Sequence, residues 1–329
     1  MTDWYIFEPV DTLFFKGAEP MVMGANHGAS SVFPPSAQTI SGAVRTEYLL
    51  QHGIDFRDYG EGAVDKQVIS DIGRAGEPAP FEIIGPIFNY HKTVFIPVPY
   101  SWYAEKERLG EGTIKVHKAK DFGETNLFYS DCCADCLWAK GETTELQSLG
   151  GRWMSESLRR TACDGVLYIT KKLPDVDADV SRSIVEGSAL FDVEYRTGVA
   201  LHDNRKAREH RLYSFAHYRL KSGVRIMFGI SKNLNIKDKG VLSLGGEKRF
   251  GYYNKLSNGS PFEKVVGQSF MTLSAIEWNQ ALNDAIIATG KIQYRGGWDM
   301  KKRFHKPMRG YFPAGSVFNK NFGENFLAI

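Results

Sequence analysis

Residues 242–253 carry the sequence Leu242-Ser243-Leu244-Gly245-Gly246-Glu247-Lys248-Arg249-Phe250-Gly251-Tyr252-Tyr253, in which an apolar strand leads into a turn rich in glycine and charge. Two adjacent glycines can adopt positive φ and leave backbone N–H groups uncovered, so the turn can approach another backbone closely and offer donors to an anion. Lys248 and Arg249 add positive charge, and Tyr252 and Tyr253 add ring faces. The stretch therefore has the parts of a site for phosphates and bases. The alternative is a β-hairpin whose turn happens to be Gly-Gly-Glu-Lys.

Motifs and composition exclude several classes of protein. No Gly-Lys-Ser/Thr ends the turn and no G-x-G-x-x-G occurs in the chain, which argues against a nucleoside-triphosphate or dinucleotide loop. The 329 residues, 43% hydrophobic and 24% charged, are typical of a globular protein with about two domains. No apolar run reaches the roughly 18 residues of a membrane span, and Met1-Thr2-Asp3-Trp4 lacks the regions of a signal peptide. We therefore expect a cytoplasmic protein without a membrane partner.

The cysteines leave a zinc site open. Three of the four lie in Cys132-Cys133-x-x-Cys136 and the fourth is Cys163, a set too small and crowded for a disulfide framework. Cys133 and Cys136 have the spacing of zinc ligands, and Cys163 or His117 could complete a structural site. A single C-x-x-C is half of that signature, so the pattern favours reduced thiols, and we predict no cofactor.

Positive charge is concentrated in two segments. Residues 196–225 hold eight Lys or Arg against two acids, and residues 291–310 hold seven against one. Each segment therefore carries +6, whereas the net charge of the whole chain is only +3. Such concentration is typical of nucleic-acid contact.

The N-terminal region predicts the order strand, loop, helix. A first strand is followed by small, polar residues 24–31, and Ser36 can cap a helix over residues 37–52 with an apolar face. The donors of the loop and the helix N-terminus could together receive a phosphate. His27 in the loop and Arg45 on the polar side of the helix are the candidate contacts.

The second half is expected to consist mainly of strands. Between strands at 189–195 and 211–220, residues 196–211 predict a projecting basic arm suited to a nucleic-acid backbone, with candidate contacts at Arg196, Arg205, Arg208 and Arg211. Tyr213 or Tyr252 could stack on bases, although Tyr213 and Phe215 could equally be core residues. Other expectations are a hairpin of residues 211–220 with 224–230, a helix at Glu277–Thr289, and solvent-exposed Arg152, Arg159 and Arg160.

The order of these elements predicts an α+β protein. Two rounds of strand, helix and strand suggest two ferredoxin-like (RRM-like) domains, the second carrying the glycine-rich loop. The Asp- and Pro-rich link at 174–181 is the candidate boundary. We therefore predict an N-terminal domain at 1–173 with insertions and a C-terminal domain at 182–329.

Several segments, in their order along the chain, resemble the third subunit of the Cmr module, a RAMP protein of type III-B CRISPR effector complexes. The resemblance covers nearly the whole chain. The segments that carry it are Glu8-Pro9-Val10-Asp11-Thr12-Leu13-Phe14-Phe15, Ser31-Val32-Phe33-Pro34-Pro35-Ser36, Gly42-Ala43-Val44-Arg45-Thr46, Arg196-Thr197-Gly198-Val199-Ala200-Leu201, Leu244-Gly245-Gly246-Glu247-x-Arg249, Gly297-Trp298-Asp299 and Pro313-Ala314-Gly315-Ser316-Val317.

This resemblance implies a non-catalytic subunit that caps the guide RNA (crRNA) by binding its repeat-derived 5′ tag. It also implies contacts with the large polymerase/cyclase-like subunit on one side and the first backbone RAMP subunit on the other, in antiviral defence. The RNA-binding residues we predict are His27, Arg45, Arg196, Arg205, Arg208, Arg211, Gly245, Gly246, Lys248, Arg249 and Tyr252.

Two other functions stay open. One is a metal-independent endoribonuclease of the same superfamily that processes guide RNA, with His27 or His202 as general acid or base and Lys248 or Arg249 stabilising the phosphorane. No second well-placed acid or base supports it. The other is a structural adaptor that touches RNA only incidentally.

Overall fold

A computed structural model describes residues 2–17, 28–29, 31–110, 112–121, 137–138, 145–161, 164–175, 178–257, 259–299 and 304–329. The chain divides into two compact units, each built from separated segments. Unit 1 comprises residues 1–86, 191–259 and 294–309, and unit 2 comprises residues 87–190, 260–293 and 310–329. Neither unit is continuous, and the division into domains at 1–173 and 182–329 stays a prediction.

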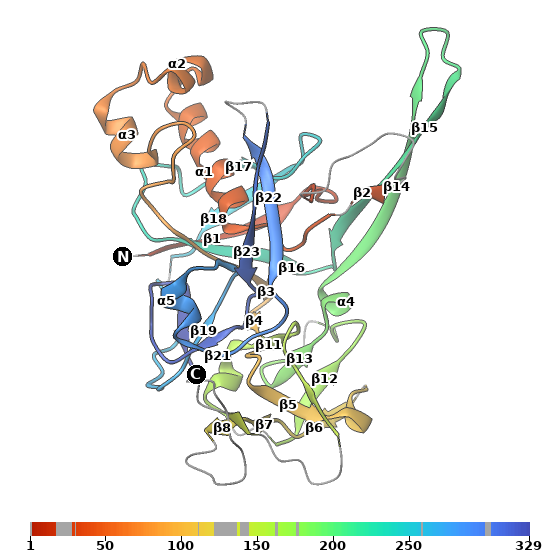
Figure 1. Cartoon of the computed structure of the whole chain (residues 1–329), viewed down its shortest axis with the longest axis vertical. Helices are drawn as coiled ribbons and strands as arrows, with labels where there is room; N and C mark the ends of the chain where they lie inside the picture. The colour runs from red at the N-terminus through yellow and green to blue at the C-terminus, as the bar shows by residue number, and fades with distance from the viewer. Residues whose placement is uncertain are drawn as a thin grey trace. The chain divides into compact units, whose positions relative to one another are not determined.

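The α+β class is confirmed, with many short strands and few helices (Figure 1). The elements that begin in unit 1 are β1 (Asp3–Pro9), β2 (Gly28–Ala29), α1 (Ala37–Gln51), α2 (Phe56–Glu61), α3 (Lys66–Ile72), β3 (Ile83–Tyr90), β14 (Phe191–Leu201), β15 (Ala207–Leu220), β16 (Val224–Ile230), β17 (Lys239–Ser243), β18 (Phe250–Lys255) and β23 (Phe304–Phe312). Those that begin in unit 2 are β4 (Thr93–Pro97), β5 (Trp102–Glu105), β6 (Gly112–Ile114), β7 (His117–Lys118), β8 (Lys120–Asp121), β9 (Leu137–Trp138), β10 (Leu146–Ser148), β11 (Trp153–Ser155), β12 (Val166–Ile169), β13 (Ser183–Val185), α4 (Gly187–Leu190), β19 (Phe270–Thr272), β20 (Ile276–Glu277), α5 (Gln280–Asn283), β21 (Ile286–Ala288), β22 (Gln293–Asp299), β24 (Val317–Phe318) and β25 (Phe326–Ala328). Among the described residues, no helix has the length and apolar content needed to cross a bilayer.

Unit 1 is built on an antiparallel sheet with the strand order β17-β18-β1-β16. Phe7 at its centre lies opposite Ile226 of β16 and Tyr253 of β18. Helix α1 begins as predicted, because the Ser36 side chain accepts a hydrogen bond from the Thr39 N–H. Its apolar side packs on one face of the sheet, where Val44 lies beside Tyr5 and Tyr253.

The neighbouring tyrosines of β18 point to opposite faces of this sheet, because side chains alternate along a strand. Tyr253 is buried beneath α1, where its hydroxyl accepts a hydrogen bond from Gln51 at 2.7 Å. Tyr252 is 57% exposed on the opposite face. Of these two rings only that of Tyr252 is accessible, and its stacking on a base stays a prediction.

Two predicted elements are wrong. The helix expected at Glu277–Thr289 is limited to α5, because the β-branched Ile286 instead pairs with Phe318 of the neighbouring strand. The hairpin expected between residues 211–220 and 224–230 does not form either. Strand β15 pairs with β14, while β16 pairs with β1 in a different sheet.

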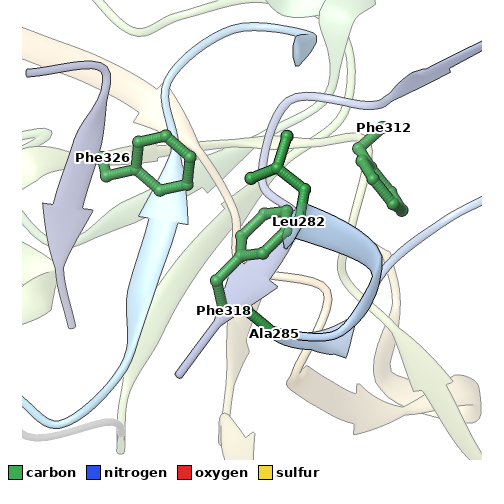
Figure 2. Packing of buried hydrophobic residues seen from close by; sticks show 5 residues of the cluster. All are labelled: Leu282, Ala285, Phe312, Phe318 and Phe326. Atoms are coloured by element: carbon green, nitrogen blue, oxygen red, sulfur yellow. The ribbon is translucent and has the colours of Figure 1, made fainter. Parts of the chain in front are cut away.

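Unit 2 contains a compact aromatic core (Figure 2). Phe318 is fully buried, and its ring lies 5.6 Å from that of Phe312 and 5.4 Å from that of Phe326 in edge-to-face arrangements. Leu282 and Ala285, from the short α5 region, close the cluster. Side-chain packing in this core therefore adds to the backbone pairing of β19 with β24 and β25.

Arg159 of unit 2 is buried, contrary to the expected exposure of Arg152, Arg159 and Arg160. It forms an ion pair with Glu156 one turn earlier, and both side chains are almost fully covered. Its guanidinium also donates to the carbonyl oxygens of Ala328 and Glu263, each at 2.9 Å. Arg160 remains the most accessible of the three, with its side chain 37% exposed and paired with Glu263. Arg159 thus links three separated segments of unit 2.

Candidate nucleic-acid interface

The basic arm is a two-stranded ribbon rather than a loop. Strands β14 and β15 pair along almost their whole length, and they extend away from the sheet of unit 1 (Figure 1). The turn at residues 202–206 is closed by a hydrogen bond from the His202 N–H to the Lys206 carbonyl at 2.8 Å. Arg205 and Lys206 are exposed in this turn. We call residues 191–220 the arm.

The two faces of the arm differ in character. One face presents Val193, Tyr195 and Val199, with Tyr195 76% exposed. The other face carries polar residues of both strands, namely Glu194, Arg196, His217 and Arg219. Strand alternation produces this division, so the charged side chains converge on one side.

Residues 244–249 form the glycine loop, which connects β17 to β18. Glu247 and Lys248 have φ of 56° and 55°, and the Arg249 N–H returns to the Gly246 carbonyl at 3.3 Å, a pattern typical of a type I′ hairpin turn. The loop also makes the predicted close approach, because the Gly246 N–H donates to the carbonyl of Phe14 at 2.8 Å. The hairpin interpretation of this stretch is therefore confirmed, and the phosphate site stays a prediction, with the Gly246 donor used within the protein.

Replacement of Gly245 by alanine should destabilise unit 1 by about 1–3 kcal/mol. Gly245 has φ of +102°, and an added Cβ would lie 2.8 Å from the Phe14 carbonyl oxygen. Gly53 is the matched control, because it has φ of +63° and an added Cβ would have no heavy atom within 4 Å. Urea unfolding of both variants checks this, and an equal loss in G53A and G245A would show that the contact with Phe14 is unimportant.

Three arginines converge on Asp11, which follows β1. Arg249 donates to Oδ2 at 2.8 Å and Arg196 to the same oxygen at 3.1 Å, while Arg219 donates to Oδ1 at 2.9 Å. Partial burial would raise the pKa of Asp11, but hydrogen bonds from the Thr12 N–H and from these arginines outweigh it and hold that pKa well below its usual range. Asp11 therefore remains an anion that orders the arginines.

The segment 196–225 is less positive than its sequence suggests. Acids outside residues 196–225 neutralise part of its charge through strand pairing. The pairs are Arg196 with Asp11 and Glu194, Arg219 with the same two acids, Lys221 with Asp192, and Arg225 with Glu8. Across the described part of the chain, Arg205, Lys206 and Lys248 form no ion pair and are exposed. The available charge is thus at the tip of the arm and on the glycine loop.

His217 lies at the junction of the arm, the glycine loop and the segment after β1. It is fully buried, its ring stacks on Phe14 at a centroid distance of 5.2 Å, and its Nδ1 is 3.3 Å from the Thr12 hydroxyl. The other ring nitrogen, Nε2, is 3.6 Å from a carboxylate oxygen of Glu247 and forms no hydrogen bond among the described residues. Nothing in the sequence indicated His217, because its partners on the first strand region and the glycine loop are distant in the chain.

The stability of unit 1 should fall as the pH drops below about 6.5. Burial lowers the pKa of His217 from its ordinary value, and Glu247 only partly offsets this. Between that lowered pKa and 6.5 the unfolded chain binds a proton that the folded chain does not, so the free energy of unfolding decreases by up to about 1.4 kcal/mol per pH unit. Urea unfolding at about pH 7.5 and about pH 5.5 checks this. The variant H217F should lose this part of the pH dependence of the free energy of unfolding. An unchanged pH dependence would contradict its attribution to His217.

The sequence matches the family of CRISPR-associated protein (Cas_Cmr3) over residues 5–271. The chain belongs to this family. The resemblance to the third Cmr subunit is thereby confirmed. No protein of curated function matches the sequence.

Solved structures share the fold of this family member. A chain of the cryo-EM structure of the type III-B Cmr-beta bound to cognate target RNA and AMPPnP aligns with a TM-score of 0.54 and 13% identity, covering 96% of this chain and 85% of the other. A chain of the Cmr-beta structure bound to cognate target RNA alone aligns with a TM-score of 0.53 and 14% identity, covering 96% and 86%. Identities this low establish similarity of fold only.

In this Cas_Cmr3 protein, the predicted site residues fall into separate groups. Gly245, Gly246, Lys248, Arg249 and Arg196 come together where the glycine loop meets the base of the arm. Tyr252 lies on the sheet face opposite α1, and Arg205 lies at the arm tip.

Arg45 has a different setting, on α1. Its guanidinium lies beside Gly73, and its Nε and Nη2 atoms are buried without a hydrogen bond among the described residues. Burial raises the pKa of the Tyr59 hydroxyl, and the positive charge of Arg45 partly offsets this rise. This arginine is therefore placed against α2 and α3, and its assignment to RNA stays a prediction.

The remaining predicted residues lie beyond the described part of the structure. His27 and the three candidate zinc ligands, Cys133, Cys136 and Cys163, are outside the described residues. The backbone of Arg208 and Arg211 belongs to β15, but their side chains are outside the description. Within the described ranges no group of three potential metal-binding side chains occurs.

Proposed function

We propose that this protein is a non-catalytic, RNA-binding subunit of a type III-B CRISPR complex that grips the 5′ tag of the guide RNA. The observation that carries the proposal is the meeting of the arm and the glycine loop at Phe14, with exposed cations on both. Membership of the Cas_Cmr3 family and the fold shared with Cmr-beta chains support the same assignment. In this role the subunit would join the large polymerase/cyclase-like subunit to the backbone RAMP subunit, and both of its domains would be ferredoxin-like.

The chemistry expected for a single strand is backbone contact combined with stacking. Lys248 on the glycine loop and Arg205 and Lys206 at the arm tip can each approach a phosphate without first breaking an ion pair to another described residue. Tyr252 and Tyr195, 57% and 76% exposed, can stack on bases.

A binding assay on the purified protein tests this function. Labelled guide RNA with and without its repeat-derived tag is titrated at about 50 mM and about 200 mM salt, with chelator present. We expect tag-dependent retention of intact RNA, with log K falling by roughly 0.7 per phosphate neutralised for each tenfold rise in salt. Specific cleavage on the same gel would instead favour the processing endoribonuclease. Absence of any tag preference would overturn the proposal for this chain.

A further inference from the structure

The Glu247 carboxylate occupies a position between two donors that are otherwise incompletely satisfied. One of its oxygens lies 3.3 Å from Arg249 Nη2 and 3.6 Å from His217 Nε2. The Nε2 atom of His217 and the Nε atom of Arg249 are both buried and lack hydrogen-bond partners among the described residues. Buried donors of this kind normally have an acceptor within hydrogen-bond distance, so the carboxylate is a poor fit for this position.

The tautomer of His217 suits the reception of an anion. When the Thr12 hydroxyl donates to Nδ1 at 3.3 Å, the ring proton is on Nε2, which then points toward Glu247. The neutral imidazole of His217, the guanidinium of Arg249 and the ammonium group of the adjacent Lys248 together form a donor set for one phosphate.

We infer that Glu247 holds the place of an RNA phosphate in the RNA-free protein and that His217 Nε2 and Arg249 receive this phosphate once Glu247 swings out. The inference rests on the proposed RNA-binding function and deepens it by identifying the group that RNA displaces. It adds His217 as a phosphate ligand and gives Glu247 an autoinhibitory role.

The exposure of the residues favours this exchange. The Glu247 side chain is 41% exposed, whereas the His217 side chain beside it is fully buried. Arg249 is 19% exposed and anchored on Asp11 through Nη1, so it would stay in place when Glu247 leaves.

The variant Glu247→Gln tests the inference, because it removes the charge and keeps the shape. We expect it to bind a labelled single-stranded RNA carrying the 5′ tag about fivefold more tightly, since a like charge beside the phosphate is lost. The dependence of log K on log salt should also steepen, because the neutral glutamine no longer offsets the positive charge of Arg249 at this phosphate. Glu61→Gln is the matched control, because Glu61 is also an exposed glutamate paired with an arginine, at 2.9 Å on α2.

A second set of variants isolates the contribution of His217 to RNA binding. When His217→Phe is also present, the new ring can still pack on Phe14. The gain in RNA affinity from Glu247→Gln should then shrink to the gain measured for Glu61→Gln. Thermal unfolding of all variants verifies that they are folded. Equal affinities of E247Q and E61Q, with wild-type protein still binding the tag, would overturn the inference and leave the proposed function intact. Failure of wild type and E247Q alike to bind tagged RNA would overturn both.

Discussion

Substitution of Arg159 by alanine should lower the free energy of unfolding by about 3–5 kcal/mol, the largest loss of stability we expect from a single change. The substitution leaves Glu156 buried without its partner. It also leaves the carbonyl oxygens of Ala328 and Glu263 without the donors that now satisfy them. Urea unfolding followed by tryptophan fluorescence and by circular dichroism measures the effect, and coincident curves verify that one transition is observed.

Arg160→Ala is the control for this experiment. Arg160 is the next residue along the chain and pairs with Glu263, but its side chain is 37% exposed and that of Glu263 is 65% exposed. An exposed pair contributes about 0–1 kcal/mol, so R160A should unfold close to wild type. Equal losses for R159A and R160A would show that the buried ion pair does not hold the segments of unit 2 together.

Combined replacement of Arg205, Lys206 and Lys248 by glutamine should weaken binding to tagged guide RNA by roughly 100-fold at about 0.1 M salt. Each lost phosphate contact accounts for about fivefold at that salt, and the magnitude of the salt slope should decrease by about 2. These three cations are exposed on the arm and the glycine loop. Fluorescence anisotropy at several salt concentrations provides both numbers.

The control removes the same charge from another part of unit 1. Arg57, Lys66 and Arg74 are exposed on and beside α2 and α3, so their replacement by glutamine matches the change in net charge. We expect this triple variant to lose less than about threefold in affinity. Equal losses in both triple variants would mean that RNA responds only to overall charge and that the arm and glycine loop make no special contact.

The sequence was most informative where local chemistry determines structure. Ser36 caps α1 as expected, and Gly245 makes the close approach to the Phe14 carbonyl that only glycine permits. Tyr252 and Tyr253 illustrate the limit of such reasoning. Alternation shows that they point in opposite directions but does not say which face is covered, and only the position of α1 decides it.

The features that the sequence could not show depend on contacts between residues that are distant in the chain. The charge of residues 196–225 looked uncompensated because Asp11 and Glu8, from the first strand region, lie far away in the chain. Arg159 looked exposed for the same reason, since the carbonyl at Ala328 that it binds is distant in the chain. Propensity failed at Glu277–Thr289, where pairing of β21 with β24 outweighed an amphipathic pattern.

Photochemical crosslinking tests the central claim most directly. A guide RNA with thiouridine placed in its 5′ tag is assembled into the full effector complex and irradiated, and the crosslinked peptides of this chain are identified by mass spectrometry. We expect crosslinks within residues 191–220 or 244–252, and none when the thiouridine is placed near the 3′ end. Crosslinks of the tag to other subunits alone, or of this chain to the 3′ end, would contradict a role at the 5′ end of the guide.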